Sequence, residues 1–229
     1  MLTGLIAGLE DDERAVGLIC VKSDEMSAQG DLLFVTRSGQ VKRTAASEYG
    51  IRRSRFAAIN LKGEDELIGV TSVAPEAKGD LLLVTRGALA LRFKLSEVPT
   101  MGRATAGVRG ILLDPEDEVL AFLLPKAGDM ALVVTDRGYG KRMLSDDVDR
   151  QKRAGKGQRV MPKNAATGLL LAAAIDVTGA TSVTFEQKHG HATQLSIAEI
   201  AVDRRTGKGQ LLVSVLLDDV VEWAVAVRE

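Results

Sequence analysis

Several residue types that often mark a compartment are scarce in this chain of 229 residues. It has a single cysteine, Cys20, so an internal disulfide is excluded and a reducing compartment is expected. No apolar run approaches the roughly 18 residues of a membrane-spanning helix. The N-terminus also lacks the charged, apolar and small-residue segments of a signal peptide. We therefore expect a cytoplasmic protein that does not contact a membrane.

Residues that support catalysis or base stacking are equally few. Aromatic residues make up 3% of the chain, which argues against single-stranded nucleic acid as a ligand because stacking platforms are missing. The only histidines, His189 and His191, could share a metal ion, but no third ligand is evident and an exposed turn is the favoured interpretation. The segment "GYGK" (Gly138–Lys141) lacks the spacing of a phosphate-binding loop. No catalytic residue, metal site or cofactor is predicted.

Tandem repetition is the main feature that is present. The segment "GDLLFVTRSGQVKRTAASEY" (Gly30–Tyr49) recurs at Gly79–Val98 and Gly128–Val148, and in weaker form at Gly179–Ile200. Each of the first three copies has a threonine followed seven residues later by an arginine, in the pairs Thr36 and Arg43, Thr85 and Arg92, and Thr135 and Arg142. An acidic segment such as "GEDELIGV" (Gly63–Val70) precedes most copies. Such a period of about 50 residues predicts an array of small β-units.

Each unit is expected to contain four short strands. In the second unit these are Ala57–Leu61, Glu66–Val73, Asp80–Thr85 and Leu89–Leu95, and the last two are joined by a tight turn. The predicted fold is all-β, a single propeller-like domain over residues 1–229 with about five four-stranded blades, four to six being compatible with the repeats. The repeats are placed at residues 3–55, 56–104, 105–153, 154–206 and 207–229, the last being partial. A linear β-solenoid is the alternative.

Charge follows the repeat although the formal net charge is only -1. Basic residues concentrate in segments 37–55, 86–109 and 137–163, whereas acidic residues concentrate in the turns before the strands. Equivalent positions of a repeat array share a face, so we expect basic residues on one rim and acidic residues on another. Ordinary solvated charges are the simpler interpretation. A basic rim would suit the phosphate backbone of duplex DNA.

The motifs "LLFVTRSGQVKRTAASEY", "PTMGRATAGVRGI" (Pro99–Ile111) and "VVTDRGYGKRMLSDDV" resemble the C-terminal domain of the A subunit of bacterial DNA gyrase and topoisomerase IV. The resemblance implies a β-pinwheel, a propeller-like fold whose neighbouring blades exchange strands, with a rim that binds and bends duplex DNA. In gyrase this domain wraps DNA, and in topoisomerase IV it biases which crossings are chosen. The cleaving tyrosine of the family lies in another domain, so this chain is expected to be non-catalytic.

The resemblance also implies partners: duplex DNA, the ATPase B subunit, and the catalytic part of the A subunit. ATP and Mg²⁺ would be bound by other parts of the parent enzyme. In gyrase the corresponding domain carries a box reading Gln-Arg-Arg-Gly-Gly-Lys-Gly, and the matching segment here is "QKRAGKG", formed by Gln151, Lys152, Arg153, Ala154, Gly155, Lys156 and Gly157. Because this box is degenerate, topoisomerase IV is favoured over gyrase.

The predicted DNA contacts are basic residues of the repeats: Arg37, Lys42, Arg43, Arg52, Arg53, Arg86, Arg92, Lys94, Arg103, Arg137, Lys141, Arg142, Lys152, Arg153 and Lys156. The fourth unit has Thr193 and Gln194 where other units hold basic residues, so it is expected to bind weakly. The alternative function is a protein-interaction propeller that recruits an acidic partner.

Overall fold

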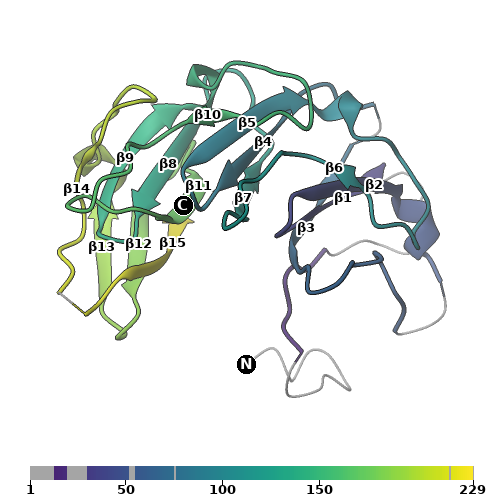
Figure 1. Ribbon diagram of the computed structural model, residues 1–229, viewed down its shortest axis with the longest axis horizontal. Coiled ribbons are helices and arrows are strands. Elements are labelled where there is room, and N and C mark those ends of the chain that lie inside the picture. The colour runs from purple at the N-terminus through teal and green to yellow at the C-terminus, as the bar shows by residue number, and fades with distance from the viewer. Residues whose placement is uncertain (1–12, 20–29, 52–54, 75, 217, 229) are drawn as a thin grey trace.

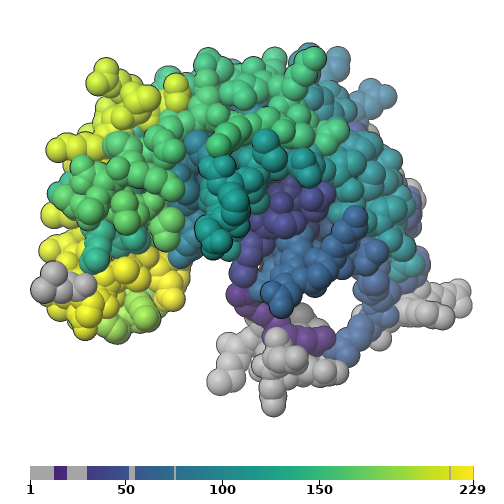
Figure 2. Space-filling view, viewed as in Figure 1, coloured from purple at the N-terminus to yellow at the C-terminus, as the bar shows by residue number. Residues whose placement is uncertain are grey.

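The computed structural model describes residues 13–19, 30–51, 55–74, 76–216 and 218–228. Cys20 lies outside these residues, as do Arg52 and Arg53. The described chain forms four antiparallel sheets that follow one another along an arc (Figure 1). On its concave side, an open space separates the first sheet from the fourth (Figure 2). The all-β prediction is confirmed. Within the described residues, no helix is long and apolar enough to span a bilayer.

A hairpin forms the two middle strands of the first three sheets, where the repeated threonine motif predicts one, and one side of the three-stranded fourth sheet, where Gln187 replaces the threonine. The hairpins are β1–β2 (Asp31–Thr36 and Gln40–Ala45), β4–β5 (Asp80–Thr85 and Leu89–Lys94), β8–β9 (Met130–Thr135 and Tyr139–Leu144) and β12–β13 (Ser182–Gln187 and Ala192–Ser196). The threonine closes the turn, because its Oγ1 accepts the N–H four residues later; in β4 this is the N–H of Leu89, at 3.1 Å from Thr85. A 3₁₀ turn follows each hairpin, at Ala46–Tyr49 (η3), Leu95–Glu97 (η4), Ser145–Asp147 (η5) and Ile197–Glu199 (η6).

The flanking strands come from later repeats, which produces the strand exchange implied by the resemblance. The inner strands β3 (Leu67–Val73), β7 (Val119–Leu123), β11 (Leu171–Asp176) and β15 (Val221–Val227) pair with β1, β4, β8 and β12. The outer strands β6 (Val108–Arg109), β10 (Gln158–Arg159) and β14 (Gln210–Leu211) pair with β2, β5 and β9. The first sheet, in the order β3-β1-β2-β6, therefore contains strands from three of the predicted repeats.

One predicted strand is wrong, because Ala57–Leu61 has no strand conformation. Its backbone is satisfied in another way. The carbonyl of Ala58 accepts hydrogen bonds from Lys42 Nζ at 3.1 Å and from the Tyr49 hydroxyl at 3.0 Å, and the N–H of Asn60 donates to the carbonyl of Thr105. Side chains here replace the partner strand that the repeat pattern suggested.

The core lies between consecutive sheets. Leu33 and Val35 of β1 pack with Leu81 and Leu83 of β4, and the same arrangement joins the second sheet to the third and the third to the fourth. The middle strands β4 and β8 are therefore buried on both faces, as their continuous apolar sequences predict.

The stacking ends at the fourth sheet within the described residues. The face of β8 that packs on the fourth sheet carries Leu132 and Val134. In β12 the corresponding residues are Thr184 and Glu186, which are only partly buried. The partial fifth unit instead supplies β15, the inner strand of the fourth sheet, so the described chain has four sheets, within the expected four to six, and the fourth has three strands in place of four.

Candidate nucleic-acid interface

Three equivalent loops lie on the outer edges of the first three sheets. Each leads from the hairpin of one sheet back to the outer edge of the preceding sheet, and we call them the first (99–107), second (149–157) and third (201–209) crossing loops. Their sequences align as "TMGRATAG", "RQKRAGKG" and "VDRRTGKG". The degenerate gyrase box is the second crossing loop. Each loop begins beside the repeated arginine, in the bridges Arg43–Thr100, Arg92–Arg150 and Arg142–Val202.

The last glycine of each crossing loop has a structural reason. Gly107, Gly157 and Gly209 have φ angles of 94°, 82° and 69°, in the left-handed region that favours glycine. A Cβ atom at Gly157 would lie 2.5 Å from the carbonyl oxygen of Ala90 in β5, and the other two glycines face the same kind of obstacle. Glycine therefore allows the loop backbone to lie directly on the outer hairpin strand.

Two of the predicted DNA contacts are wrong, because Lys42 and Lys141 have no exposed surface. Lys42 Nζ donates to the carbonyls of Ala58, Arg103 and Thr105, at 2.5–3.3 Å. Lys141 Nζ donates to the carbonyls of Arg204, Arg205 and Gly207, at 2.5–2.8 Å. Desolvation by burial lowers the pKa of both lysines, that of Lys141 to about 8. These side chains support the crossing loops from beneath and cannot reach a phosphate on the surface.

The repeated arginines are mostly used within their sheets. Arg43 Nε lies 3.6 Å from Asp31, and its side chain is only 17% exposed. Arg92, 13% exposed, lies 3.3 Å from Asp80 and donates to Asp146. The pKa of Asp146 is lowered, first by the N–H of Gly128 and then by Arg92. Arg142 Nε donates to the carbonyl of Ile200 at 2.7 Å. Arg43 and Arg92 thus pair with the first strand of their own hairpin, Arg92 and Arg142 also bond the 3₁₀ turn of the next sheet, and little of their charge faces solvent.

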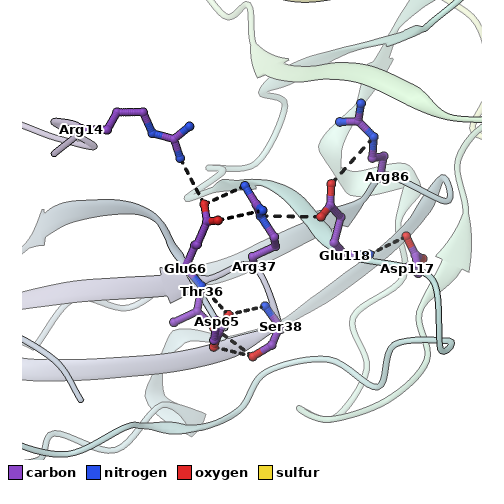
Figure 3. Close-up of polar contacts among 9 residues, drawn as sticks. All are labelled: Arg14, Thr36, Arg37, Ser38, Asp65, Glu66, Arg86, Asp117 and Glu118. Atoms are coloured by element: carbon purple, nitrogen blue, oxygen red, sulfur yellow. Dashed lines mark hydrogen bonds and ion pairs between the residues drawn. The ribbon is translucent and has the colours of Figure 1, made fainter. Parts of the chain in front are cut away.

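At the hairpin tips, basic and acidic residues mix (Figure 3). Arg37 lies 2.8 Å from Glu66 and 3.6 Å from Glu118, and Arg86 lies 3.8 Å from Glu118. The acidic turns also hold the tips through the backbone, since Asp65 accepts the N–H of Ser38 at 2.8 Å. The prediction that basic and acidic residues occupy separate rims is therefore wrong at this edge.

Asp117 and Asp219 accept the corresponding tip N–H groups, from Gly87 and His189. Arg137, at the third tip, is partly buried.

The arginines of the crossing loops connect one loop to the next. Arg153 donates from its side chain to the carbonyls of Glu97 and Arg109, and its backbone N–H donates to the Glu97 carboxylate at 3.0 Å. Arg205 makes the corresponding bond to the carbonyl of Arg159, at 2.7 Å. In the first loop, the Arg103 guanidinium lies 5.0 Å from the centre of the Phe56 ring. These contacts fix the spacing of the loops along the arc.

Few of the predicted contacts remain available to a ligand. Lys94 and Lys152 are exposed, and their side chains make no hydrogen bond or ion pair within the described residues. Lys156 is also exposed, although it pairs with Asp114 at 2.8 Å. Four exposed basic residues at the same edge were missed: Arg109, Arg159, Arg204 and Lys208. Alignment of the three crossing loops and of the short strands that follow them, in place of the hairpins, is the signal that would have found them. We call Arg109, Lys152, Lys156, Arg159, Arg204 and Lys208, which lie in a crossing loop or in the strand directly after it, the crossing-loop cations.

The two histidines lie beside a buried carboxylate. His189 Nδ1 is 3.7 Å and His191 Nδ1 is 3.9 Å from Asp219, which is 1% exposed. Protonation of either ring would create an ion pair with Asp219. Across the described ranges, no three His, Cys, Asp or Glu side chains are grouped as metal ligands.

Solved structures with this fold include the C-terminal domain of DNA topoisomerase IV, with a TM-score of 0.90 and 24% identity over 99% of this chain and 70% of that one. A DNA gyrase A C-terminal domain gives a TM-score of 0.82 with 19% identity, over 98% of this chain and 74% of that one. Both show the likeness of the folds.

Curated relatives include the DNA gyrase A subunit of Salmonella typhimurium strain LT2, 31% identical, and that of Staphylococcus aureus strain MRSA252, 34% identical. Each match covers 96% of this chain and 25% of the relative, so the chain spans about a quarter of their length. The family model described as DNA gyrase C-terminal domain, beta-propeller, matches residues 30–74, 79–126 and 129–174. Since these matches cover more than half of the sequence, the chain belongs to the DNA gyrase C-terminal domain family.

Proposed function

We propose that this chain is a non-catalytic domain of the A subunit of a type IIA topoisomerase and that it holds duplex DNA against its crossing-loop cations. The observation that carries this proposal is the repetition of exposed basic loops at the same edge of successive sheets. Most other basic candidates of the repeats are partly or fully buried, whereas the crossing-loop cations are all exposed, although Lys156 pairs with Asp114 and Arg159 donates to the carbonyl of Gly87. Binding through phosphates is independent of sequence and sensitive to salt.

The arc suits a bent duplex. Bending 20–30 base pairs costs on the order of 1–6 kcal/mol, so several phosphate contacts must act together along the curve. The arginine links between loops favour this, because they hold the cations at fixed spacing before DNA arrives. The fourth sheet has Thr193 and Gln194 in β13 and is proposed to bind weakly.

In the parent enzyme, this domain would guide DNA segments toward strand passage. The ATPase B subunit would hydrolyse ATP, and the catalytic part of the A subunit would cleave DNA. The second crossing loop favours topoisomerase IV over gyrase. Ala154 occupies the position where the gyrase box has glycine, and it adopts a φ of 64°. The backbone of this loop is therefore strained in comparison with a box that has glycine here.

The test combines plasmid topology with matched variants. Relaxed circular plasmid is incubated with the domain and a nicking-closing topoisomerase, and the linking number is measured. A shift that grows with protein and fades with salt would indicate chiral wrapping, whereas salt-sensitive retardation of long duplexes without a shift would fit binding or bending as proposed for topoisomerase IV.

The variant Lys152→Ala/Arg204→Ala/Lys208→Ala should lose most of the retardation. The control is Lys62→Ala/Lys78→Ala, which removes two exposed lysines outside the crossing loops. Equal losses in both variants, or no binding by the unaltered domain, would contradict the proposal. No binding would instead favour a protein-interaction propeller with an acidic partner.

A further inference from the structure

The buried lysines have a role that the DNA-contact prediction did not include. Lys141 and Lys42 lie on the second strands of their hairpins, β9 and β2, directly beneath the third and first crossing loops. An ammonium group has three N–H donors and no acceptor. In both places the structure offers three carbonyl oxygens, and at Lys141 all three belong to the third crossing loop. One buried ammonium thus satisfies three loop carbonyls at once.

The second sheet shows what happens without the lysine. Leu91 occupies the corresponding place in β5 and is fully buried. The second crossing loop instead receives a donor from its neighbour, because the N–H of Leu112 donates to the carbonyl of Gly155 at 2.9 Å. The residue that corresponds to Leu112 one repeat later is Pro162, which has no N–H to offer. The carbonyl of Gly207, which corresponds to that of Gly155, accepts from Lys141.

We propose that Lys141 is a positioning residue that holds the third crossing loop in the conformation that meets phosphate, without touching DNA itself, and that Lys42 supports the first crossing loop from beneath in the same way. This inference rests on the proposed function, since it assigns a support to the same surface. The role is clearest for Lys141, because all three of its carbonyl partners belong to one crossing loop. Its loop presents Arg204 and Lys208 on the outside while Lys141 binds the carbonyls of Arg204, Arg205 and Gly207 from the inside.

Protonation makes this role measurable. Burial lowers the pKa of Lys141 to about 8; Asp203 and Asp147 raise it, and Arg205 and Arg204 lower it. Above that pH the neutral amine has two N–H donors for three carbonyls, so one carbonyl loses its bond. Exposed lysines titrate near 10.4 and stay charged over the same range. If the third crossing loop depends on Lys141, DNA binding should weaken between pH 7 and 9, with a midpoint near 8. If it does not, binding should change little over this range.

The experiment measures duplex binding by fluorescence anisotropy from pH 6.5 to 9.5, for the unaltered protein and for Lys141→Met. The variant keeps every exposed cation and places an apolar side chain where Leu91 lies in the second sheet. We expect binding to weaken roughly three- to tenfold at pH 7, the size of losing one or two phosphate contacts. We also expect its pH profile to be flat across pH 8. Hydrogen exchange of the Gly207 and Gly209 amides should be faster in the variant.

Three results separate the possible failures. If the unaltered protein does not bind duplex DNA at any pH, the proposed function fails and this inference fails with it. If Lys208→Ala weakens binding but Lys141→Met does not, the DNA surface stands and the positioning role is overturned. A profile with the same midpoint in the protein and in Lys141→Met would also overturn it. Should Lys141→Met not fold, Lys141→Gln replaces it in the same comparison, because its amide keeps two of the three N–H donors, and binding equal to that of the unaltered protein at every pH would overturn the proposal.

Discussion

The second and third crossing loops have almost the same sequence, "KRAGKG" at residues 152–157 and "RRTGKG" at residues 204–209, yet they are supported differently. The third is held from beneath by Lys141. The second rests on Leu91 and is held from the side, where Ala154 N–H donates to the carbonyl of Gly110 and Leu112 N–H donates to that of Gly155. Similar loop sequences are thus supported by contacts with different residues far away in the chain.

The largest effect is expected from replacing the last glycine of a crossing loop, which the second and third loops share. Gly157→Ala should destabilise the domain by about 3 kcal/mol or more, since it combines a positive φ with a collision against the Ala90 carbonyl. The matched control is Gly179→Ala, which has a φ of 68° but open space around its Cβ, and it should cost only about 1 kcal/mol. Urea denaturation measures both. Equal losses would show that the close approach of loop and strand is unimportant.

A second change tests the exchange between lysine and proline. Lys141→Leu should cost about 1–3 kcal/mol in the free energy of unfolding at pH 7, because three carbonyls lose their donor. Adding Pro162→Leu should recover part of this loss, since the new N–H can donate to Gly207 as Leu112 does to Gly155. Chemical denaturation of the single and double variants measures the coupling. Strictly additive effects would mean that Pro162 is not the reason for the lysine.

The second and third crossing loops also differ in backbone strain. Ala154 has a φ of 64°, whereas Thr206, at the corresponding position of the third loop, is not among the described residues with positive φ. Ala154→Gly should therefore stabilise the domain by about 0.5–1 kcal/mol by relieving left-handed strain. Thr206→Gly should be neutral or destabilising. Thermal melts provide the measurement, and stabilisation by both substitutions would contradict the difference.

The smallest effect concerns the outward lysines. Lys156 is bound to Asp114, whereas Lys208 makes no hydrogen bond or ion pair within the described residues. Lys208→Ala should weaken duplex binding several-fold and lower the salt slope by about one. Lys156→Ala should do less, and Asp114→Asn should strengthen binding slightly by releasing Lys156. Anisotropy titrations at several salt concentrations test this order, which a stronger effect of Lys156→Ala would reverse.

Linkage at Lys141 has a defined sign. Its folded pKa of about 8 lies below the ordinary value of 10.5, so the native state releases its proton first as pH rises. The contribution of Lys141 to the free energy of unfolding therefore increases as the pH rises from 8 to about 10.5. Stability and the proposed DNA binding should consequently change in opposite directions above pH 8.

Local chemistry in the sequence determined the hairpins. Thr36, Thr85 and Thr135 mark the turns because their hydroxyls bond four residues ahead, and glycines such as Gly39 supply the positive φ that the turns require. These interactions span a few residues, so their pattern can be found by inspection. Strand exchange came from the family resemblance, because nothing in a single repeat shows which earlier hairpin a strand will join.

Only the tertiary structure decided which charges remain outside. Lys42 and Lys141 read as surface lysines on short strands, and their burial depends on carbonyls about 16 to 66 residues further along the chain. From the sequence, Arg37 and Arg86 are predicted to be free cations of the rim. In the structure, Glu66 lies beside Arg37 and Glu118 lies beside Arg86. Thr184 and Glu186 likewise stay only partly buried, because no further sheet packs on them within the described residues. The sequence by itself determined where the chain turns, and long-range packing determined which polar groups each turn would meet.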